Sequence, residues 1–274
     1  MTGKSDWEGR VGETWAQEWR RTDRAFGALT DRLLAATRGA IFHRVLDIGC
    51  GAGELSLAVA RGRPDARVVG VDVSPALIEA ARQRGSALAN AEFAVADASR
   101  WEAETDTRPD LMLSRHGVMF FDEPTEAFIH LAGQAAEDAD LLFSCFRSSR
   151  ENPAFAEIRH LVPNPPVTVD PFAPGPFAFA ERSHVVGILE TAGWRDIAFE
   201  PFDFPMVLGA GDDPVEDAIG YFRRIGPAAA AARDMEVAAR ERFFDRIRAL
   251  CERHHHDGIV AMAAAAWIVT GRKA

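Results

Sequence analysis

The chain contains 274 residues and carries a formal net charge of −10 at neutral pH, with 47% hydrophobic and 26% charged residues. This length accommodates one large domain, or a domain with a substantial cap. The negative charge disfavours nucleic acid as a substrate, because proteins that track phosphates usually present a basic surface.

Cysteine usage and apolar runs favour a cytoplasmic protein. The three cysteines are widely spaced and odd in number, which indicates neither a disulfide framework nor a zinc site; they are Cys50, Cys145 and Cys251. The N-terminus lacks the apolar core of a signal peptide, and the longest apolar run, 259–269, is too short to span a bilayer. We therefore expect a cytoplasmic location and no membrane partner.

Residues 1–40 are polar at first and then amphipathic. Trp7, Trp15 and Trp19 precede apolar residues that recur at helical spacing between Phe26 and Ala36. The pattern predicts two helices before the first strand, which together form an N-terminal helical cap. The simplest role for the tryptophans is to pack these helices onto the main domain.

Strand and helix patterns alternate from residue 41 to residue 146. Apolar runs predict strands near 43–48, 67–72, 91–95, 109–114 and 140–146, and periodic segments predict helices near 53–62, 75–85 and 124–137. Such alternation predicts a parallel sheet with helices on both faces. Ligands of these sheets bind at the carboxyl ends of the strands.

The most informative stretch joins the first strand to the first helix. The strand run 45–48 is followed by Gly49, Gly51 and Gly53, and helical spacing starts at Glu54. Glycines are needed at a tight turn, where a side chain would block the backbone angles and would keep a ligand off the main chain. The pattern therefore predicts a binding surface made of backbone.

Spacing and charge indicate which ligand this turn accepts. A dinucleotide fingerprint requires its third glycine three residues after the second, but that position is Glu54, which would repel a pyrophosphate. The second predicted strand ends at Asp72, about 20 residues further on, where such folds place a carboxylate against ribose hydroxyls. These features favour a nucleoside without phosphates.

These residues resemble the class I S-adenosylmethionine-dependent methyltransferases. The run Val-Leu-Asp-Ile-Gly-Cys-Gly-Ala-Gly at 45–53 resembles the first motif of that family, Asp-Val-Ser at 72–74 the second, and residues 94–98 the third. The resemblance implies S-adenosylmethionine as cofactor and S-adenosylhomocysteine as product. It also implies a doubly wound α/β fold with a mostly parallel seven-stranded sheet, helices on both faces and an antiparallel last strand.

The resemblance assigns roles to individual residues. It implies that the glycines at 49, 51 and 53 pass beneath the methionine part of the cofactor, that Asp47 orders the turn, that Asp72 holds the ribose hydroxyls and that Asp97 meets the adenine amino group. The further candidate cofactor contacts are Cys50, Val73, Ala98, Ser114, Arg115 and Trp19. An N-terminal helix often folds over the cofactor in this family, so Trp15, Gln17 and Trp19 are alternative candidates for closing the site.

The C-terminal half completes the sheet and adds a cap. Seven prolines between residues 147 and 181 predict an extended loop, either a lid or a structural crossover. A helix at 181–192 and strands at 196–204 and 262–270 fit the family pattern, and helices near 213–225 and 234–253 lie between those strands. We expect a core of residues 41–205 and 259–274, and a helical cap of residues 206–258 that encloses an acceptor pocket.

Methyl transfer from a sulfonium is an in-line displacement and requires no dedicated catalytic residue. A carboxylate acceptor attacks as it stands, whereas a phenol or an alcohol needs a base. His116, at the end of the fourth strand, is the candidate base or a ligand for an acceptor carboxylate when protonated; the alternative is a histidine stacked near adenine. The candidate pocket walls are Met119, Phe120 and Tyr221, each of which also fits an ordinary core position.

Two further features leave alternatives open. Arg115 either binds the carboxylate of the cofactor or of an acidic acceptor, or pairs with Asp122 or Glu123. The run His254–His256 predicts no metal site, because consecutive helical residues point in different directions; it fits a solvated helix end.

The predicted function is S-adenosylmethionine-dependent methyl transfer to a small-molecule or peptide acceptor, at a hydroxyl or carboxylate oxygen, by a monomer or a homodimer. The first alternative is an NAD-dependent oxidoreductase, which Glu54 and the glycine spacing disfavour. The second is a non-catalytic cofactor-binding protein of the same fold.

Overall fold

A mixed β-sheet organises residues 3–163, 165 and 170–274, the part of the chain that the computed structural model describes. The strand order is β3-β2-β1-β4-β5-β8-β6, in which β1 to β5 are parallel and β8 is antiparallel to both of its neighbours. The strands are β1 (Arg44–Ile48), β2 (Arg67–Asp72), β3 (Ala91–Val95), β4 (Leu111–Arg115), β5 (Asp140–Phe146), β6 (Trp194–Gly209), β7 (His255–His256) and β8 (Ile259–Lys273). The predicted fold class is confirmed, and the two-residue β7, which pairs with β8, is an addition to it.

Helices connect the parallel strands. They are α4 (Glu54–Gly62), α5 (Pro75–Gly85), α6 (Pro124–Gln134) and α8 (Arg182–Thr191), with short 3-10 turns η1 (Thr105–Thr107), η2 (Val118–Phe120) and η3 (Ser149–Glu151). Ser74 caps α5, since its hydroxyl accepts a hydrogen bond from the Leu77 amide at 3.4 Å. Right-handed crossovers place α4 and α5 on one face of the sheet, while α6 and α8 pack together on the other.

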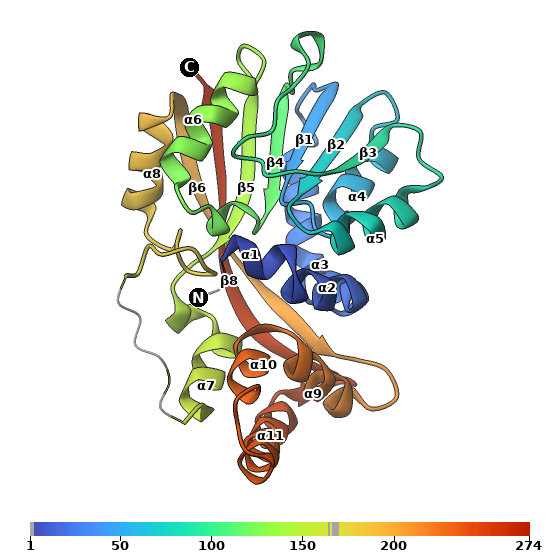
Figure 1. The fold of residues 1–274 in the computed structure, drawn as a ribbon, viewed down its shortest axis with the longest axis vertical. Helices are drawn as coiled ribbons and strands as arrows, with labels where there is room; N and C mark the ends of the chain where they lie inside the picture. The colour runs from blue at the N-terminus through green and yellow to red at the C-terminus, as the bar shows by residue number, and fades with distance from the viewer. Residues whose placement is uncertain (1–2, 164, 166–169) are drawn as a thin grey trace.

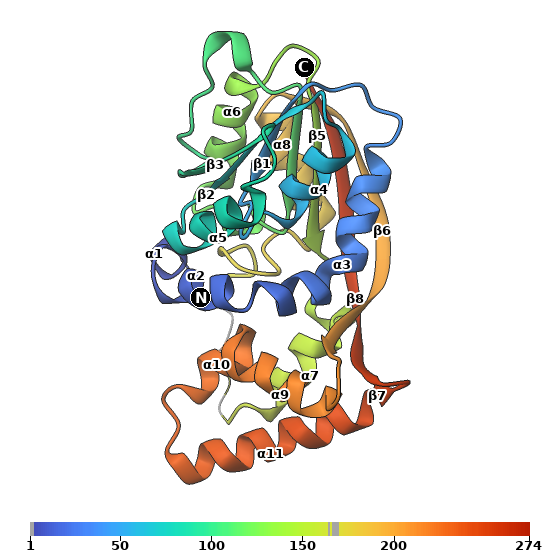
Figure 2. The same ribbon diagram turned by 90° about the vertical axis from the view of Figure 1, so that its right-hand side faces the viewer.

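The N-terminal segment forms three helices, not the two predicted from the sequence. They are α1 (Lys4–Glu8), α2 (Arg10–Gln17) and α3 (Trp19–Ala36), separated at Gly9 and Glu18, neither of which has helical backbone angles. The apolar face of α3 is buried at Ala25, Phe26 and Leu29, and α3 packs along β6. In Figures 1 and 2, α1, α2 and the start of α3 cross below the carboxyl ends of the parallel strands.

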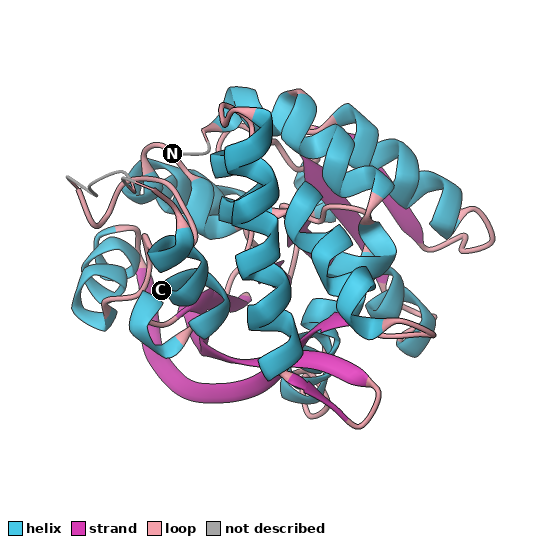
Figure 3. Cartoon of the chain, turned by 90° about the horizontal axis from the view of Figure 1, so that it is seen from below, coloured by secondary structure: helices cyan, strands magenta, loops and turns pink. Residues whose placement is uncertain are grey.

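The last two long strands extend far beyond the predicted ranges 196–204 and 262–270. β6 and β8 pair from Trp194 opposite Lys273 to Gly209 opposite Val260, with two irregularities in register. Because they pair with each other along this length, they leave the core as a two-stranded arm that leads to the cap (Figure 1). Seen from below, the arm curves around one side of the helices (Figure 3).

The cap contains two helices that were not predicted from the sequence, α7 (Pro153–Leu161) and α10 (Gly226–Ala232). Its other helices are α9 (Pro214–Arg224) and α11 (Val237–Arg253). The extended loop predicted for 147–181 is therefore wrong over α7, which packs against α10 and α11; residues 164 and 166–169 of that loop lie outside the described part. Pro153 occupies the first turn of α7, where the missing amide hydrogen breaks no helical hydrogen bond. None of the described helices is long and apolar enough to cross a membrane.

Candidate functional site

The glycine turn between β1 and α4 has the backbone that its residue types predict. Gly49, Gly51 and Gly53 have φ values of 65°, 55° and 86°, a region that favours glycine. A Cβ on Gly49 would lie 2.9 Å from the Cα of Gly117, so the loop after β4 passes directly against the turn. A Cβ on Gly51 would meet no atom within 4 Å. The main chain at Gly49 and Gly51 faces a large cavity, whereas Gly53 packs against Ala81 and Phe93 and does not line that cavity.

Carboxylates of the first two strands hold this turn in place. Asp72 accepts hydrogen bonds from the Gly51 amide at 3.0 Å and from the Ser74 amide at 2.9 Å. Asp47 is buried; its Oδ2 accepts from the Ser56 hydroxyl at 2.5 Å, and its Oδ1 has no partner in the described structure. Burial raises the pKa of Asp47 to about 6, partly offset by the bond from Ser56. Asp47 therefore ties the end of β1 to α4 through Ser56.

The third motif is connected to the N-terminal helices. Asp97 forms an ion pair with Lys4 of α1 at 2.7 Å and accepts hydrogen bonds from the amide and the hydroxyl of Ser99. Its pKa is lowered, because these bonds and the Lys4 charge outweigh the effect of burial. Asp97 thus lines the cavity as an anion that α1 already contacts.

A cavity of about 3,040 Å³ extends from the glycine turn to the cap. It collects most of the predicted site residues on its wall; these are Asp47, Gly49, Cys50, Gly51, Asp72, Val73, Asp97, Ala98, Arg115, His116, Met119, Phe120 and Tyr221. The structure places Ser114, Gly53 and Trp19 off this wall. Ser114 is buried and joins two strand ends, since its hydroxyl donates to the Ile48 carbonyl at 2.7 Å and accepts from the Gly117 amide at 3.1 Å.

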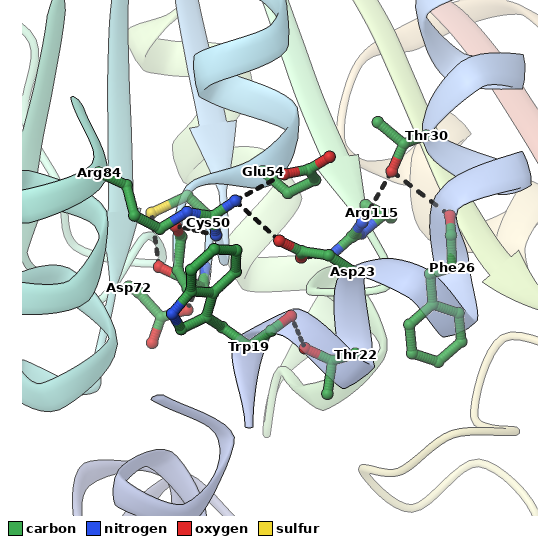
Figure 4. Close-up of polar contacts among 12 residues, drawn as sticks. Trp19, Thr22, Asp23, Phe26, Thr30, Cys50, Glu54, Asp72, Arg84 and Arg115 are labelled. Carbon is green, nitrogen blue, oxygen red and sulfur yellow. Dashed lines mark hydrogen bonds and ion pairs between the residues drawn. The ribbon is translucent and has the colours of Figure 1, made fainter. Parts of the chain in front are cut away.

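Arg84 of α5 is the centre of an ion-pair cluster behind the turn (Figure 4). Its guanidinium pairs with Glu54 at 2.7 Å and with Asp23 at 2.8 Å, and it donates to the Ala52 carbonyl at 2.8 Å. The ring of Trp19 lies over this guanidinium at 3.8 Å, so Trp19 covers Arg84 and does not reach the cavity. The charge of Glu54, which the sequence analysis set against an anionic ligand, is therefore compensated by Arg84.

Arg115 pairs with neither of the carboxylates proposed for it. Its guanidinium donates to the Thr30 hydroxyl at 2.7 Å and lies 3.4 Å from Asp23, both on α3 (Figure 4). Asp23 therefore links Arg84 and Arg115. Burial raises the pKa of Asp23 to about 6, although the two arginines counteract the shift. No sequence spacing indicates this contact between α3 and the strand ends.

His116 lies beside the glycine turn in the left-handed region, with φ 65°. Its Nδ1 is 3.1 Å from the Ser144 hydroxyl, and its ring packs against Phe26 and Phe146, with centroid distances of 5.6 Å and 4.1 Å. Its Nε2 is buried and has no partner in the described part of the chain. Burial lowers the pKa of His116 to about 3, so the ring is neutral at neutral pH and a weak base.

The remaining wall residues are apolar. Met119 is buried and Phe120 is half-buried, with its ring edge-to-face against Trp7 at 5.2 Å. Tyr221 is buried, which raises its pKa. Trp7 and Trp15 of the N-terminal helices also line the cavity, as does Gln17, and the indole nitrogen of Trp7 is buried without a partner in the described structure. No group of three or more potential metal-ligating side chains occurs among the described residues, which include the His254–His256 run.

Comparison with known proteins agrees with this geometry. Residues 45–137 match the family model described as a methyltransferase domain. The chain is 25% identical over 163 residues to a malonyl-[acyl-carrier protein] O-methyltransferase of Paenibacillus sp., covering 57% of this chain and 54% of that protein. It is 27% identical over 222 residues to a trans-aconitate 2-methyltransferase of Paracidovorax citrulli, covering 75% and 82%. The alignment thus spans about half of the first relative and most of the second.

Solved structures share the fold. The crystal structure of the YcgJ protein from Bacillus subtilis superimposes with a TM-score of 0.57 at 17% sequence identity, covering 91% of this chain and 97% of that one. The matched domain model, the relatives and the strand order lead to one assignment. Residues 45–137 belong to a methyltransferase domain family, and the chain is similar to class I S-adenosylmethionine-dependent methyltransferases, whose cofactor is S-adenosylmethionine.

The residues present fit that cofactor. The bare main chain at Gly51 leaves room for a ligand, and Asp47, whose buried Oδ1 has no partner in the described structure, lies on the wall of the same cavity. Asp72 has its carboxylate fixed by two amides at the end of β2. A cationic ligand suits this end of the cavity, because eight carboxylates and only four cationic side chains occur on its wall between residues 4 and 126.

Proposed function

We propose that this chain transfers the methyl group of S-adenosylmethionine to a carboxylate oxygen of a small organic acid. The observation that carries the proposal is a change of charge along the cavity. The wall formed by residues 4–126 carries an excess of carboxylates, whereas the wall formed by residues 148–248 carries seven arginines and five carboxylates. In a chain with a net charge of −10, this excess of arginine favours an anionic acceptor on the cap side.

The chemistry next to the glycine turn supports a carboxylate over an alcohol or a phenol. Bound S-adenosylmethionine supplies an electrophilic methyl group. His116 directly precedes Gly117, the residue that contacts Gly49 of the glycine turn. Its pKa of about 3 makes it a poor proton acceptor for a hydroxyl group. A carboxylate is already ionised at neutral pH and needs no base. The surrounding Phe26 and Phe146 rings help to exclude water from the acceptor.

The names of the relatives agree with this choice, since a malonyl-[acyl-carrier protein] O-methyltransferase and a trans-aconitate 2-methyltransferase are among them. We assign the same class of acceptor, a carboxylic acid, to this chain. The cofactor site we propose consists of Asp47, Gly49, Cys50, Gly51, Asp72, Val73, Asp97 and Ala98. Met119, Phe120 and Tyr221 are proposed as acceptor-pocket walls.

Arg223 is the arginine that we propose to recognise the acceptor carboxylate. It lies on the cavity wall two residues after Tyr221, its guanidinium lies 5.1 Å from the ring centroid of Phe244, and it has no ion pair among the described residues. The neighbouring Arg224, by contrast, pairs with Glu18 at 3.0 Å. An arginine without a carboxylate partner can give its fork of donors to a carboxylate of the ligand.

The decisive experiment is a methyl-transfer assay with S-adenosylmethionine and matched acceptors. The panel contains trans-aconitate and other di- and tricarboxylic acids, the corresponding alcohols, phenols and amines, and mass spectrometry identifies the product. Methyl esters formed from the acids are expected. Transfer to phenols or amines with no ester from any acid would refute the carboxylate assignment. Binding of S-adenosylhomocysteine without transfer to any class would favour the non-catalytic alternative.

Arg223→Gln tests the recognition step separately. The variant should raise the KM for the acid about tenfold or more and leave the affinity for S-adenosylhomocysteine unchanged, because a charge-assisted contact is lost only on the acceptor side. Arg242→Gln is the matched control, since Arg242 is an exposed arginine of α11 outside the cavity wall. Equal KM values for both variants would exclude Arg223 from acceptor recognition.

A further inference from the structure

The tertiary structure joins His116 to a residue that the sequence analysis did not select. Ser144 of β5 is fully buried, its carbonyl accepts the His116 amide at 3.2 Å, and its hydroxyl lies 3.1 Å from Nδ1 of His116. Two contacts with one residue therefore set both the backbone and the ring of His116. The left-handed backbone costs about 1–3 kcal/mol in a non-glycine residue, which surrounding structure must compensate.

Hydrogen-bond satisfaction selects the tautomer of this ring. Nδ1 of His116 is the only partner of the Ser144 hydroxyl in the described structure. If Nδ1 carried the proton and donated, the buried hydroxyl hydrogen would be left without an acceptor. If the hydroxyl donates to Nδ1, the hydroxyl hydrogen and Nδ1 are satisfied, and of this pair only the ring proton, on Nε2, lacks a partner in the described structure. The other tautomer would leave both the hydroxyl hydrogen and Nε2 without a partner. The arrangement therefore favours the Nε2–H tautomer.

The proton on Nε2 has no acceptor within the described part of the chain. Nε2 is buried, His116 lies on the cavity wall, and the next residue, Gly117, touches Gly49 of the glycine turn. The His116 residue is thus part of the cavity wall beside the turn that the family resemblance assigns to the methionine part of the cofactor. Burial keeps the ring neutral, since it lowers the pKa of His116 to about 3. A neutral donor avoids the repulsion that an imidazolium would have with a sulfonium.

We propose that His116 binds the acceptor as a neutral hydrogen-bond donor through Nε2–H, with Ser144 as the positioning residue that sets its tautomer. This inference rests on the proposed function, because the donor would bond to the carboxylate oxygen that is not methylated. It differs from a general-base role, in which Nε2 would have to accept a proton. No bond to His116 forms or breaks in the reaction.

The first test measures the tautomer directly. Nitrogen-15 NMR of the histidine-labelled full chain with bound S-adenosylhomocysteine, assigned through the His116→Gln variant, should show a protonated Nε2 and an unprotonated Nδ1 between pH 5.5 and 8. Ser144→Ala should shift the equilibrium toward the other tautomer, and adding trans-aconitate should perturb the Nε2–H signal. A protonated Nδ1 in the unmodified protein would overturn the proposal whether or not any acceptor is methylated.

The second test separates a donor from a base through kinetics. His116→Phe should raise the KM for trans-aconitate about tenfold or more, and His116→Gln, which offers an amide donor, should retain most of the affinity. The kcat/KM of the unmodified enzyme should be flat between pH 5.5 and 8. A rising limb that disappears in His116→Phe would show a base and overturn the proposal. His116→Asn, which tolerates the left-handed backbone, controls for folding through its S-adenosylhomocysteine affinity.

The two tests also distinguish the inference from the proposed function. If no carboxylic acid is methylated but NMR shows the Nε2–H tautomer dependent on Ser144, the proposed function fails and the ring geometry stands. If acids are methylated with equal efficiency by the unmodified enzyme and by His116→Phe, the function stands and the role of His116 is refuted.

Discussion

Replacing Gly12 by alanine should detach the N-terminal helices from the core. Gly12 lies on α2 where that helix packs against α5, and a Cβ there would stand 2.1 Å from the Ser74 hydroxyl and 2.2 Å from the Trp7 carbonyl. Real contacts of a Cβ are longer than 3.0 Å, so α2 must move by roughly 1 Å. The Trp7 carbonyl belongs to the backbone of α1 and cannot rotate away.

The size of the effect follows from two opposing terms. Alanine improves the intrinsic stability of a helix over glycine by about 0.5–1 kcal/mol, while overpacking of this kind costs about 1–3 kcal/mol. The net loss of docking free energy should be roughly 1–2 kcal/mol. Residues of α1 and α2 form part of the cavity wall and Lys4 pairs with Asp97, so undocking should weaken S-adenosylhomocysteine binding by up to about 30-fold.

Gly27→Ala is the matched control, because a Cβ on Gly27 of α3 would meet nothing within 4 Å. It should raise the free energy of unfolding by about 0.5–1 kcal/mol and leave the ligand affinity unchanged. Calorimetry measures the affinity, and amide hydrogen exchange of residues 4–17 reports docking. If Gly12→Ala retains the exchange protection and the affinity of the unmodified protein, the packing argument is refuted.

Three other changes test separate parts of the structure. Asp23→Asn should remove a pH dependence of the free energy of unfolding. Because burial raises the pKa of Asp23 from 3.8 to about 6 on folding, the folded state binds more protons than the unfolded state between these pH values. Denaturant titration should therefore show that the unmodified protein loses up to about 3 kcal/mol of stability relative to the variant as pH rises from 4 to 6. Gly117→Ala places a Cβ 2.5 Å from the Ile48 carbonyl and should lower stability by roughly 2 kcal/mol and weaken S-adenosylhomocysteine binding; an unchanged melting temperature would contradict this. Asn152→Ala removes the side-chain oxygen that accepts the buried Ala265 amide at 3.0 Å, while the Ala265 carbonyl keeps its bond from the Arg147 amide at 2.9 Å; thermal unfolding should reveal a loss of about 1–3 kcal/mol.

The central strands and their helices could be predicted closely from the sequence. The bounds of β2, β3 and β5 match the predicted ranges, and α5 does so as well. β5 is buried along almost its whole length and α5 buries one face, so the local apolar pattern is enough to locate them, whereas β3 is an apolar run at the sheet edge with only Phe93 buried. The glycine turn was also predictable, because glycine adopts positive φ angles more readily than other residues and this preference can be read from the sequence position by position.

The arm and the cap were less predictable for identifiable reasons. β6 and β8 are long because they pair with each other beyond the core, and pairing between distant segments has no local signature. α7 was missed because Pro153 and the prolines that follow the helix suggested an extended loop, although a proline at the first helical position is compatible with a helix. The break between α1 and α2 at Gly9 was likewise hidden within one amphipathic pattern.

The site divides in the same way. The sequence by itself determined the strand-to-helix turn, the carboxylate that ends β2 and the position of His116 after β4, because strand order in a parallel sheet brings such positions to one edge. Only the tertiary structure decided that Arg84 neutralises Glu54, that Lys4 reaches Asp97 and that Ser144 orients His116. The physical reason is that backbone angles and burial are constraints on neighbouring residues. Ion pairs and tautomers depend instead on which side chains from distant parts of the sequence lie close together in the folded structure.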